Sequence, residues 1–195
     1  MKLIGFYDYT VILTYLSLLS ACNGMVLASR ERFTAAVLCL LVSGICDAFD
    51  GVVARSKKNR TEDEKAFGVQ IDSLCDAVSF GVFPAVLCYF IGVDGIPGLL
   101  ILFAYCLCAV IRLAFFNVLE GNRQKVESGC NKSYRGLPVT SVSILLPVVW
   151  LFRGLLPVHT FLGLLHAVMA VTAFLFVLDF SVKKPDWSRL VIRSR

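Results

Sequence analysis

Uncharged runs about as long as a membrane is thick dominate this chain. The first runs from Tyr9 to Ser29 without a charged side chain. About 20 helical residues span the ~30 Å hydrocarbon core of a bilayer, so each such run predicts a membrane-spanning helix. The chain of 195 residues is 57% hydrophobic with a mean hydropathy of +0.77, more apolar than a soluble domain of this length. We therefore expect an all-α integral membrane protein.

The positions of these runs predict the domain organisation. We expect one transmembrane domain at residues 1–180, followed by a basic cytoplasmic tail at 181–195. The fifth run is the least regular, because it contains Arg153 and is interrupted by prolines. The six expected spans are residues 9–29, 33–55, 66–93, 96–119, 137–156 and 158–179.

Basic residues predict the orientation of these spans. The chain has 19 lysines and arginines, of which only Arg30, Arg32 and Arg153 fall in the connections on one side of the membrane. Arg112 lies within a span, and the others flank the termini and the two remaining connections. Cytoplasmic loops carry the excess of Lys and Arg, so both termini are expected in the cytoplasm of a cell-membrane protein. The net charge of +5 fits contact with anionic lipid headgroups, and no nucleic-acid-binding motif is present.

Four aspartates lie inside predicted spans, where carboxylates are costly. Asp47 and Asp50 are three residues apart, and Asp72 and Asp76 are four apart, so each pair shares one helix face. The two helices are joined by a short basic connection and can bring both pairs together. Clustered carboxylates suit hard divalent cations such as Mg²⁺ or Mn²⁺. Helix capping or pairing with basic residues is the alternative, and it suits Asp50 and Arg55 better than two matched pairs.

The segment that holds these aspartates resembles a known family signature. It reads D-A-F-D-G-V-V-A-R from Asp47 and, after a spacer, G-V-Q-I-D-S-L-C-D up to Asp76. This is similar to the CDP-alcohol phosphotransferase pattern D-x-x-D-G-x-x-A-R followed by G-x-x-x-D-x-x-x-D. The resemblance implies a six-helix membrane bundle that forms a homodimer and binds two divalent ions, Mg²⁺ or Mn²⁺. The implied metal ligands are Asp47, Asp50, Asp72 and Asp76, with Asp76 also the catalytic base. The implied CDP-lipid site comprises Asp50, Gly51, Ala54, Arg55 and Gly68.

Three further segments resemble the phosphatidylserine synthase branch of that family. They are S-F-G-V-F-P-A from Ser79, R-L-A-F-F-N from Arg112, and Y-R-G-L-P ending at Pro138. The resemblance implies transfer of a phosphatidyl group from CDP-diacylglycerol to L-serine, with CMP as the second product. The chain departs from the branch at Phe115, where a second arginine is usual. It also departs from the usual N-x-x-T opening of the first span, because Val11 stands in place of the asparagine three residues before Thr14.

An acceptor site for serine needs a cation for the carboxylate of the amino acid. Arg112 lies well inside a predicted span, whereas Arg55 and Arg153 lie at or near span ends, and it could equally bind the lipid pyrophosphate or neutralise the aspartates. The candidate acceptor-binding residues are Ser79, Arg112, Asn117, Lys132 and Arg135.

Other readings of the same residues stay open at this point. Within the family, the acceptor could be glycerol 3-phosphate, inositol or inositol phosphate. Outside it, intramembrane carboxylates also occur in divalent-ion transporters. Because no Cys or His follows the acidic motif directly, the sequence favours direct displacement over a covalent enzyme intermediate.

Overall fold

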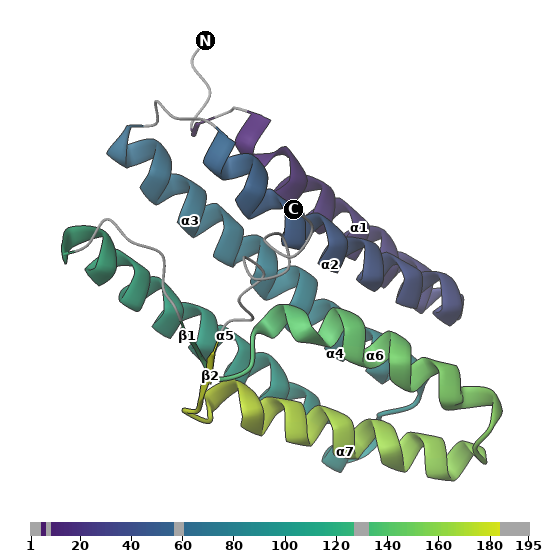
Figure 1. Ribbon diagram of the computed structural model, residues 1–195. Helices are drawn as coiled ribbons and strands as arrows, with labels where there is room; N and C mark the ends of the chain where they lie inside the picture. The colour runs from purple at the N-terminus through teal and green to yellow at the C-terminus, as the bar shows by residue number, and fades with distance from the viewer. Residues whose placement is uncertain (1–4, 7–8, 57–60, 127–132, 184–195) are drawn as a thin grey trace, which may run out of the picture.

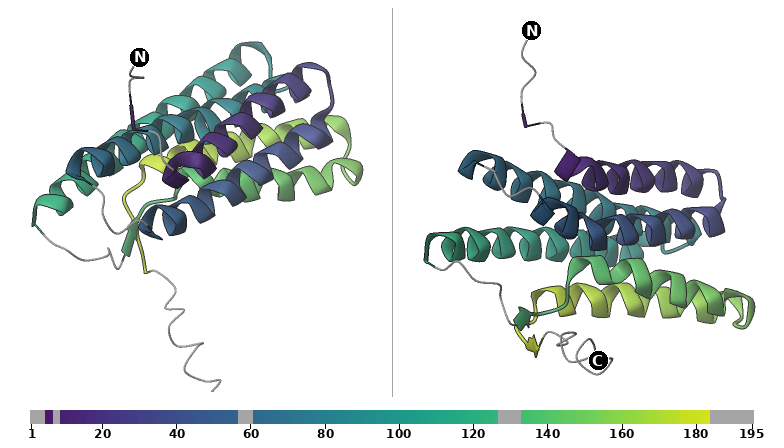
Figure 2. Two further views of the ribbon diagram at one scale, coloured as in Figure 1. Left: turned by 90° about the horizontal axis from the view of Figure 1, so that it is seen from above. Right: turned by 45° about the horizontal axis from the view of Figure 1, so that its top comes forward.

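The helices of this protein run side by side along one long axis (Figures 1 and 2). The structure, a computed structural model, describes residues 5–6, 9–56, 61–126 and 133–183. Its α-helices are α1 (Ile12–Ser29), α2 (Phe33–Ser56), α3 (Glu62–Asp76), α4 (Phe83–Ile91), α5 (Gly95–Val126), α6 (Val142–Leu151) and α7 (Val158–Val177). Short 3₁₀ turns η1 (Tyr9–Val11), η3 (Val139–Ser141) and η4 (Phe152–Gly154) flank α1 and α6, and a π-helical segment, η2 (Ala77–Val82), joins α3 to α4.

The expected six-helix membrane bundle is confirmed. In the part of the chain that the structure describes, five helical stretches are long and apolar enough to cross a membrane, and Val139–Gly154 forms a sixth, shorter apolar helix. Large apolar side chains point outward along the bundle, including Ile96, Leu151 and Leu155, each more than three-quarters exposed. Such exposure is unfavourable in water and favourable against lipid chains.

The third predicted span begins and ends elsewhere than expected from hydropathy. Its helix starts at Glu62, because Thr61 and Glu64 form a reciprocal capping box that adds a polar first turn outside the apolar run. It then continues through η2 into α4 and ends at Gly92, whose φ of 126° stops the helix. The π-helical turn directly follows Asp76, and the Tyr105 hydroxyl donates to the Phe80 carbonyl within it, at 2.6 Å.

The fifth predicted span is shorter than expected. Residues 137–156 were the expectation, whereas the helix covers Val139–Gly154 with 3₁₀ turns at both ends. Pro138 has an extended conformation and so marks the beginning of the helix, and Pro157 similarly precedes α7.

A small β-element accompanies the helical bundle. β1 (Ser133–Arg135) and β2 (Ser181–Lys183) pair antiparallel, with Tyr134 opposite Val182. The first residues of the predicted tail therefore join the segment between α5 and α6. The rest of the tail, 184–195, lies outside the described residues.

Small and hydroxyl side chains let α1 and α2 approach each other closely. Ser17 and Ser43 each donate to the other's carbonyl, at 3.2 and 2.7 Å. Gly24 lies against the ring of Phe83 on α4, so a Cβ there would collide with it. Close backbone approach of this kind is how membrane helices associate without a hydrophobic driving force. In this way α1 packs against both α2 and α3, the helices that carry the aspartates.

Candidate active site

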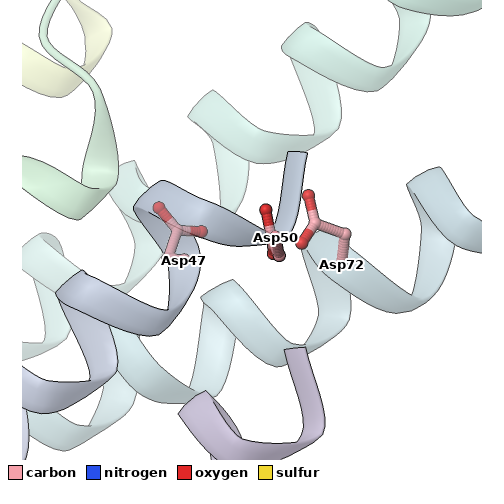
Figure 3. A group of neighbouring side chains, drawn as sticks. All are labelled: Asp47, Asp50 and Asp72. Atoms are coloured by element: carbon pink, nitrogen blue, oxygen red, sulfur yellow. The ribbon is translucent and has the colours of Figure 1, made fainter. Parts of the chain in front are cut away.

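The aspartates of α2 and α3 converge as their spacing predicted. Ligand oxygens of Asp47, Asp50 and Asp72 all lie within 4.8 Å of one another (Figure 3). Asp76 lies one turn beyond Asp72, and its carboxyl group neighbours that of Asp47, while that of Asp72 neighbours Asp50. Because the two helices are antiparallel, the first aspartate of α2 faces the last of α3. The result is two carboxylate pairs across one helix–helix contact.

This arrangement is unfavourable without a cation. Two like charges ~4 Å apart repel by about 4 kcal/mol at the effective dielectric of a protein surface. The Oδ1 atom of Asp72 is buried and has no hydrogen-bond partner among the described residues. Oxygen-only ligands are the set that Mg²⁺ and Mn²⁺ prefer. The residues present therefore fit a divalent metal, and the cluster can hold one.

Thr14 contacts the acidic cluster, and the motif analysis did not identify it as a site residue. Its hydroxyl, buried on α1, donates to Oδ2 of Asp50 at 3.3 Å. The available signal was the family's N-x-x-T opening, of which this chain keeps the threonine and not the asparagine. Thr14 thus anchors Asp50 from a third helix, α1.

A polar cavity of about 680 Å³ opens beside the carboxylates. All four aspartates line it, as do Gly51 from α2 and Arg112 from α5. The segment from Pro138 to Ser141 and the first turn of α6 form its other wall. The cavity therefore combines four acids and one base at the meeting point of α2, α3, α5 and α6.

An apolar groove adjoins this cavity. It has a volume of about 630 Å³, lies between α6 and α7, and shares Ser141 and Ile144 with the polar cavity. Its remaining walls are almost entirely aliphatic, with side chains such as Leu145, Val148 and Val171. A molecule with a charged head and an apolar chain finds both surfaces next to each other here.

Arg112 is the predicted acceptor residue whose side chain the structure brings to the aspartates. It lines the cavity and lies against Gly136, where a Cβ would come within 2.6 Å of its Nη1. Asp179, just after α7, also interacts with it electrostatically. Asp179 was not singled out from the sequence, because it falls at the end of a span where a charge is unremarkable.

Two other predicted acceptor residues point elsewhere. Ser79 is fully buried in η2, and its hydroxyl has no hydrogen-bond partner among the described residues. The Asn117 side chain accepts a 2.7 Å hydrogen bond from Ser73 and so links α5 to α3. Neither belongs to the described residues that line the cavity.

The remaining predicted site residues are only partly described. Gly68 lies in α3, half-buried and outside the cavity lining. The backbones of Ala54 and Arg55 belong to α2 and that of Arg135 to β1, but their side chains are outside the described part of the structure, as is the whole of Lys132.

Comparison with known proteins agrees with this arrangement. The family model for CDP-alcohol phosphatidyltransferases matches residues 9–180. The chain therefore belongs to the CDP-alcohol phosphatidyltransferase family. Its membrane helices and the acidic cluster between α2 and α3 agree with this match.

Several curated relatives are similar to this chain. The archaetidylserine synthase of Methanothermobacter thermautotrophicus is 35% identical over 133 residues, which cover 66% of this chain and 53% of the relative. The CDP-diacylglycerol–serine O-phosphatidyltransferases of Saccharomyces cerevisiae and Methanocaldococcus jannaschii are 34% and 32% identical, each over 68% of this chain and over 48% and 56% of their own lengths. The chain spans about half the length of these relatives. No solved structure matches it.

Proposed function

We propose that this protein transfers a phosphatidyl group from CDP-diacylglycerol to L-serine and releases CMP. The observation that carries the proposal is the cavity itself, in which paired carboxylates and Arg112 lie beside an apolar groove. The substrate would place its nucleotide diphosphate at the acids and its acyl chains along the groove or the surrounding lipid. The relatives are named as an archaetidylserine synthase and a CDP-diacylglycerol–serine O-phosphatidyltransferase, and these names support serine as the acceptor.

The chemistry assigned to the protein side chains is a single displacement. Asp76 accepts the proton of the serine hydroxyl, whose oxygen forms a bond to the lipid-linked phosphorus. The bond from that phosphorus to the bridging oxygen breaks, and CMP leaves with the electron pair. General-base assistance typically contributes about 10²–10⁴-fold to such a rate.

Two divalent ions, Mg²⁺ or Mn²⁺, are proposed for Asp47, Asp50, Asp72 and Asp76. When bound, they supply charge stabilisation for the pyrophosphate and the leaving CMP. The nucleotide is assigned to the α2 side, where Gly51 lines the cavity without a side chain to obstruct it. Asp50, Ala54, Arg55 and Gly68 complete the proposed CDP-lipid site by their match to the family pattern.

Arg112 is the proposed recognition element for an oxyanion of the substrate. A guanidinium donates several hydrogen bonds in one plane and suits either a carboxylate or a phosphate. Its place on the cavity wall makes it the first of the acceptor candidates to test. Ser79, Asn117, Lys132 and Arg135 are proposed as further contacts only through the resemblance.

The active site is proposed to face the cytoplasm of a cell membrane, in a homodimer. Support for the orientation comes from the arrangement of the bundle, because the end of α5, the β1–β2 pair and the joined ends of α2 and α3 are at the same end of the bundle (Figure 1). The termini and the two connections assigned to this side carry 15 of the 19 lysines and arginines. The dimer is inferred from the family resemblance alone.

CMP release by purified protein in detergent tests the proposal. The assay supplies CDP-diacylglycerol with Mn²⁺ or Mg²⁺ and compares serine, glycerol 3-phosphate, inositol and inositol phosphate. The expected result is CMP release with serine only, and loss of release on adding EDTA. Release with another acceptor would reject serine while keeping the family chemistry. No release from folded protein that still binds Mn²⁺ would reject the transferase and direct attention to ion flux in proteoliposomes.

A further inference from the structure

Arg112 is half-buried where α5 meets the end of α7. A Cβ built on Gly136 would lie 2.6 Å from Arg112 Nη1 and 2.9 Å from the Leu178 carbonyl oxygen, so all three groups are packed together. Gly136 has a φ of 70°, a conformation that favours glycine. Its N–H donates to the Phe180 carbonyl at 2.6 Å. The segment after α7 is therefore fastened to the segment before α6 beside the guanidinium.

Carboxylates on more than one side of Arg112 compete for its guanidinium. Arg112 lines the same cavity as four aspartates, and a guanidinium next to carboxylates forms bidentate pairs readily. Asp179, between Leu178 and Phe180 in this fastened segment, is a further carboxylate that interacts electrostatically with Arg112. Asp179 is not among the residues that line the cavity, so its attraction for Arg112 competes with that of the acidic cluster inside it.

We propose that Asp179 is a positioning residue that holds Arg112 on the cavity wall and keeps it from occupying the metal-binding carboxylates. Arg112 then offers its cavity-side donors to an oxyanion of the substrate, either the serine carboxylate or the lipid pyrophosphate. The inference rests on the proposed function for the identity of that oxyanion. The position proposed for Arg112 is independent of the proposed function, because a metal-binding measurement can report it without turnover.

The variant Asp179→Asn removes the charge and keeps the shape of the side chain. We expect the guanidinium to move toward the aspartates and compete with metal, so that Mn²⁺ affinity, measured by electron paramagnetic resonance on purified protein, falls at least fivefold. In the CMP-release assay we expect KM for one substrate to rise at least tenfold while kcat changes less than threefold. A rise in KM for serine assigns Arg112 to the acceptor carboxylate, and a rise for CDP-diacylglycerol assigns it to the pyrophosphate.

Three variants separate positioning from general damage. Asp179→Glu keeps the charge and should restore Mn²⁺ affinity to within twofold of the wild type. Asp94→Asn makes the same chemical change at an exposed site before α5 and should leave Mn²⁺ affinity unchanged. Arg112→Gln combined with Asp179→Asn should regain wild-type Mn²⁺ affinity, because the competing cation is gone.

The double variant also supplies the decisive comparison for turnover. If Asp179 acts through Arg112, its loss should add less than twofold to the KM of Arg112→Gln. Unchanged Mn²⁺ affinity and unchanged KM values in folded Asp179→Asn would overturn the proposal, as would additive effects in the double variant. Should Asp179→Asn not fold, Asp179→Ser takes its place under the same criteria. If the wild type releases no CMP with any acceptor, the proposed function fails, and the Mn²⁺ titrations still decide the role of Asp179.

Discussion

The hydroxyl of Thr14 on α1 donates a hydrogen bond to Asp50 on α2, 3.3 Å away. Asp50 also contacts Asp72 on α3, so three helices meet at this one carboxylate. A carboxylate held from two sides loses little rotamer freedom when it binds a metal, and groups that orient a ligand in this way tune metal affinity.

Replacing Thr14 should therefore weaken metal binding without unfolding the bundle. A hydrogen bond of this kind contributes about 1 kcal/mol, so Thr14→Val should lower Mn²⁺ affinity by about fivefold. Thr14→Ser keeps the hydroxyl and should stay within twofold of the wild type. Equal Mn²⁺ affinities for the valine and serine variants, from titration of purified protein, would show that the bond does not orient Asp50.

Asp76→Asn should separate proton transfer from substrate binding. The amide cannot accept the serine proton, so kcat should fall by about 10²–10⁴-fold. CDP-diacylglycerol binding, measured by retention of radiolabelled lipid, should remain within threefold, because Asp47, Asp50 and Asp72 remain to hold metal. More than a few per cent of wild-type turnover in Asp76→Asn would exclude Asp76 as the base.

The Ser73–Asn117 hydrogen bond should stabilise the folded protein. Ser73→Ala removes the donor of a part-buried bond between α3 and α5 and should lower the free energy of unfolding by about 1 kcal/mol. In a protein of this size that corresponds to a fall in Tm of about 2–4 °C. Asn117→Ala should have a similar effect, and the double variant should melt close to the single ones. Additive falls in Tm in detergent would mean that the two side chains act independently.

A side chain at Gly24 should destabilise the protein, whereas one at Gly163, another helical glycine, should not. Gly24→Ala places a methyl group against the Phe83 ring and should lower Tm, because the core must shift to admit it. Gly163→Ala is the matched control, since nothing lies within 4 Å of its Cβ position, and it should leave Tm unchanged or raise it. Phe83→Leu should recover part of the loss at Gly24. If both alanine variants melt alike, the close approach of α1 and α4 is not required.

Much of the fold could be predicted because the lipid environment restricts what a chain can do. Apolar runs of bilayer length become helices, since each backbone polar group must be satisfied within its own segment. The span boundaries were less accurate, because they depend on local signals that hydropathy ignores. The capping box at Thr61 lengthens α3, and Pro138 shortens the helix that follows it. The β1–β2 pair joins residues far apart in the chain, and no local pattern predicts it.

The sequence by itself determined the membrane class, the helical bundle and the acidic motif, because helix periodicity places Asp47 with Asp50 and Asp72 with Asp76. Only the tertiary structure decided which side chains complete the site. It brought Thr14 to Asp50, put Arg112 on the cavity wall beside Gly136, and turned Asn117 toward Ser73. These contacts join different helices, and their geometry depends on how the helices are rotated and how deeply they pack. Neither quantity is encoded in the spacing of residues along one helix.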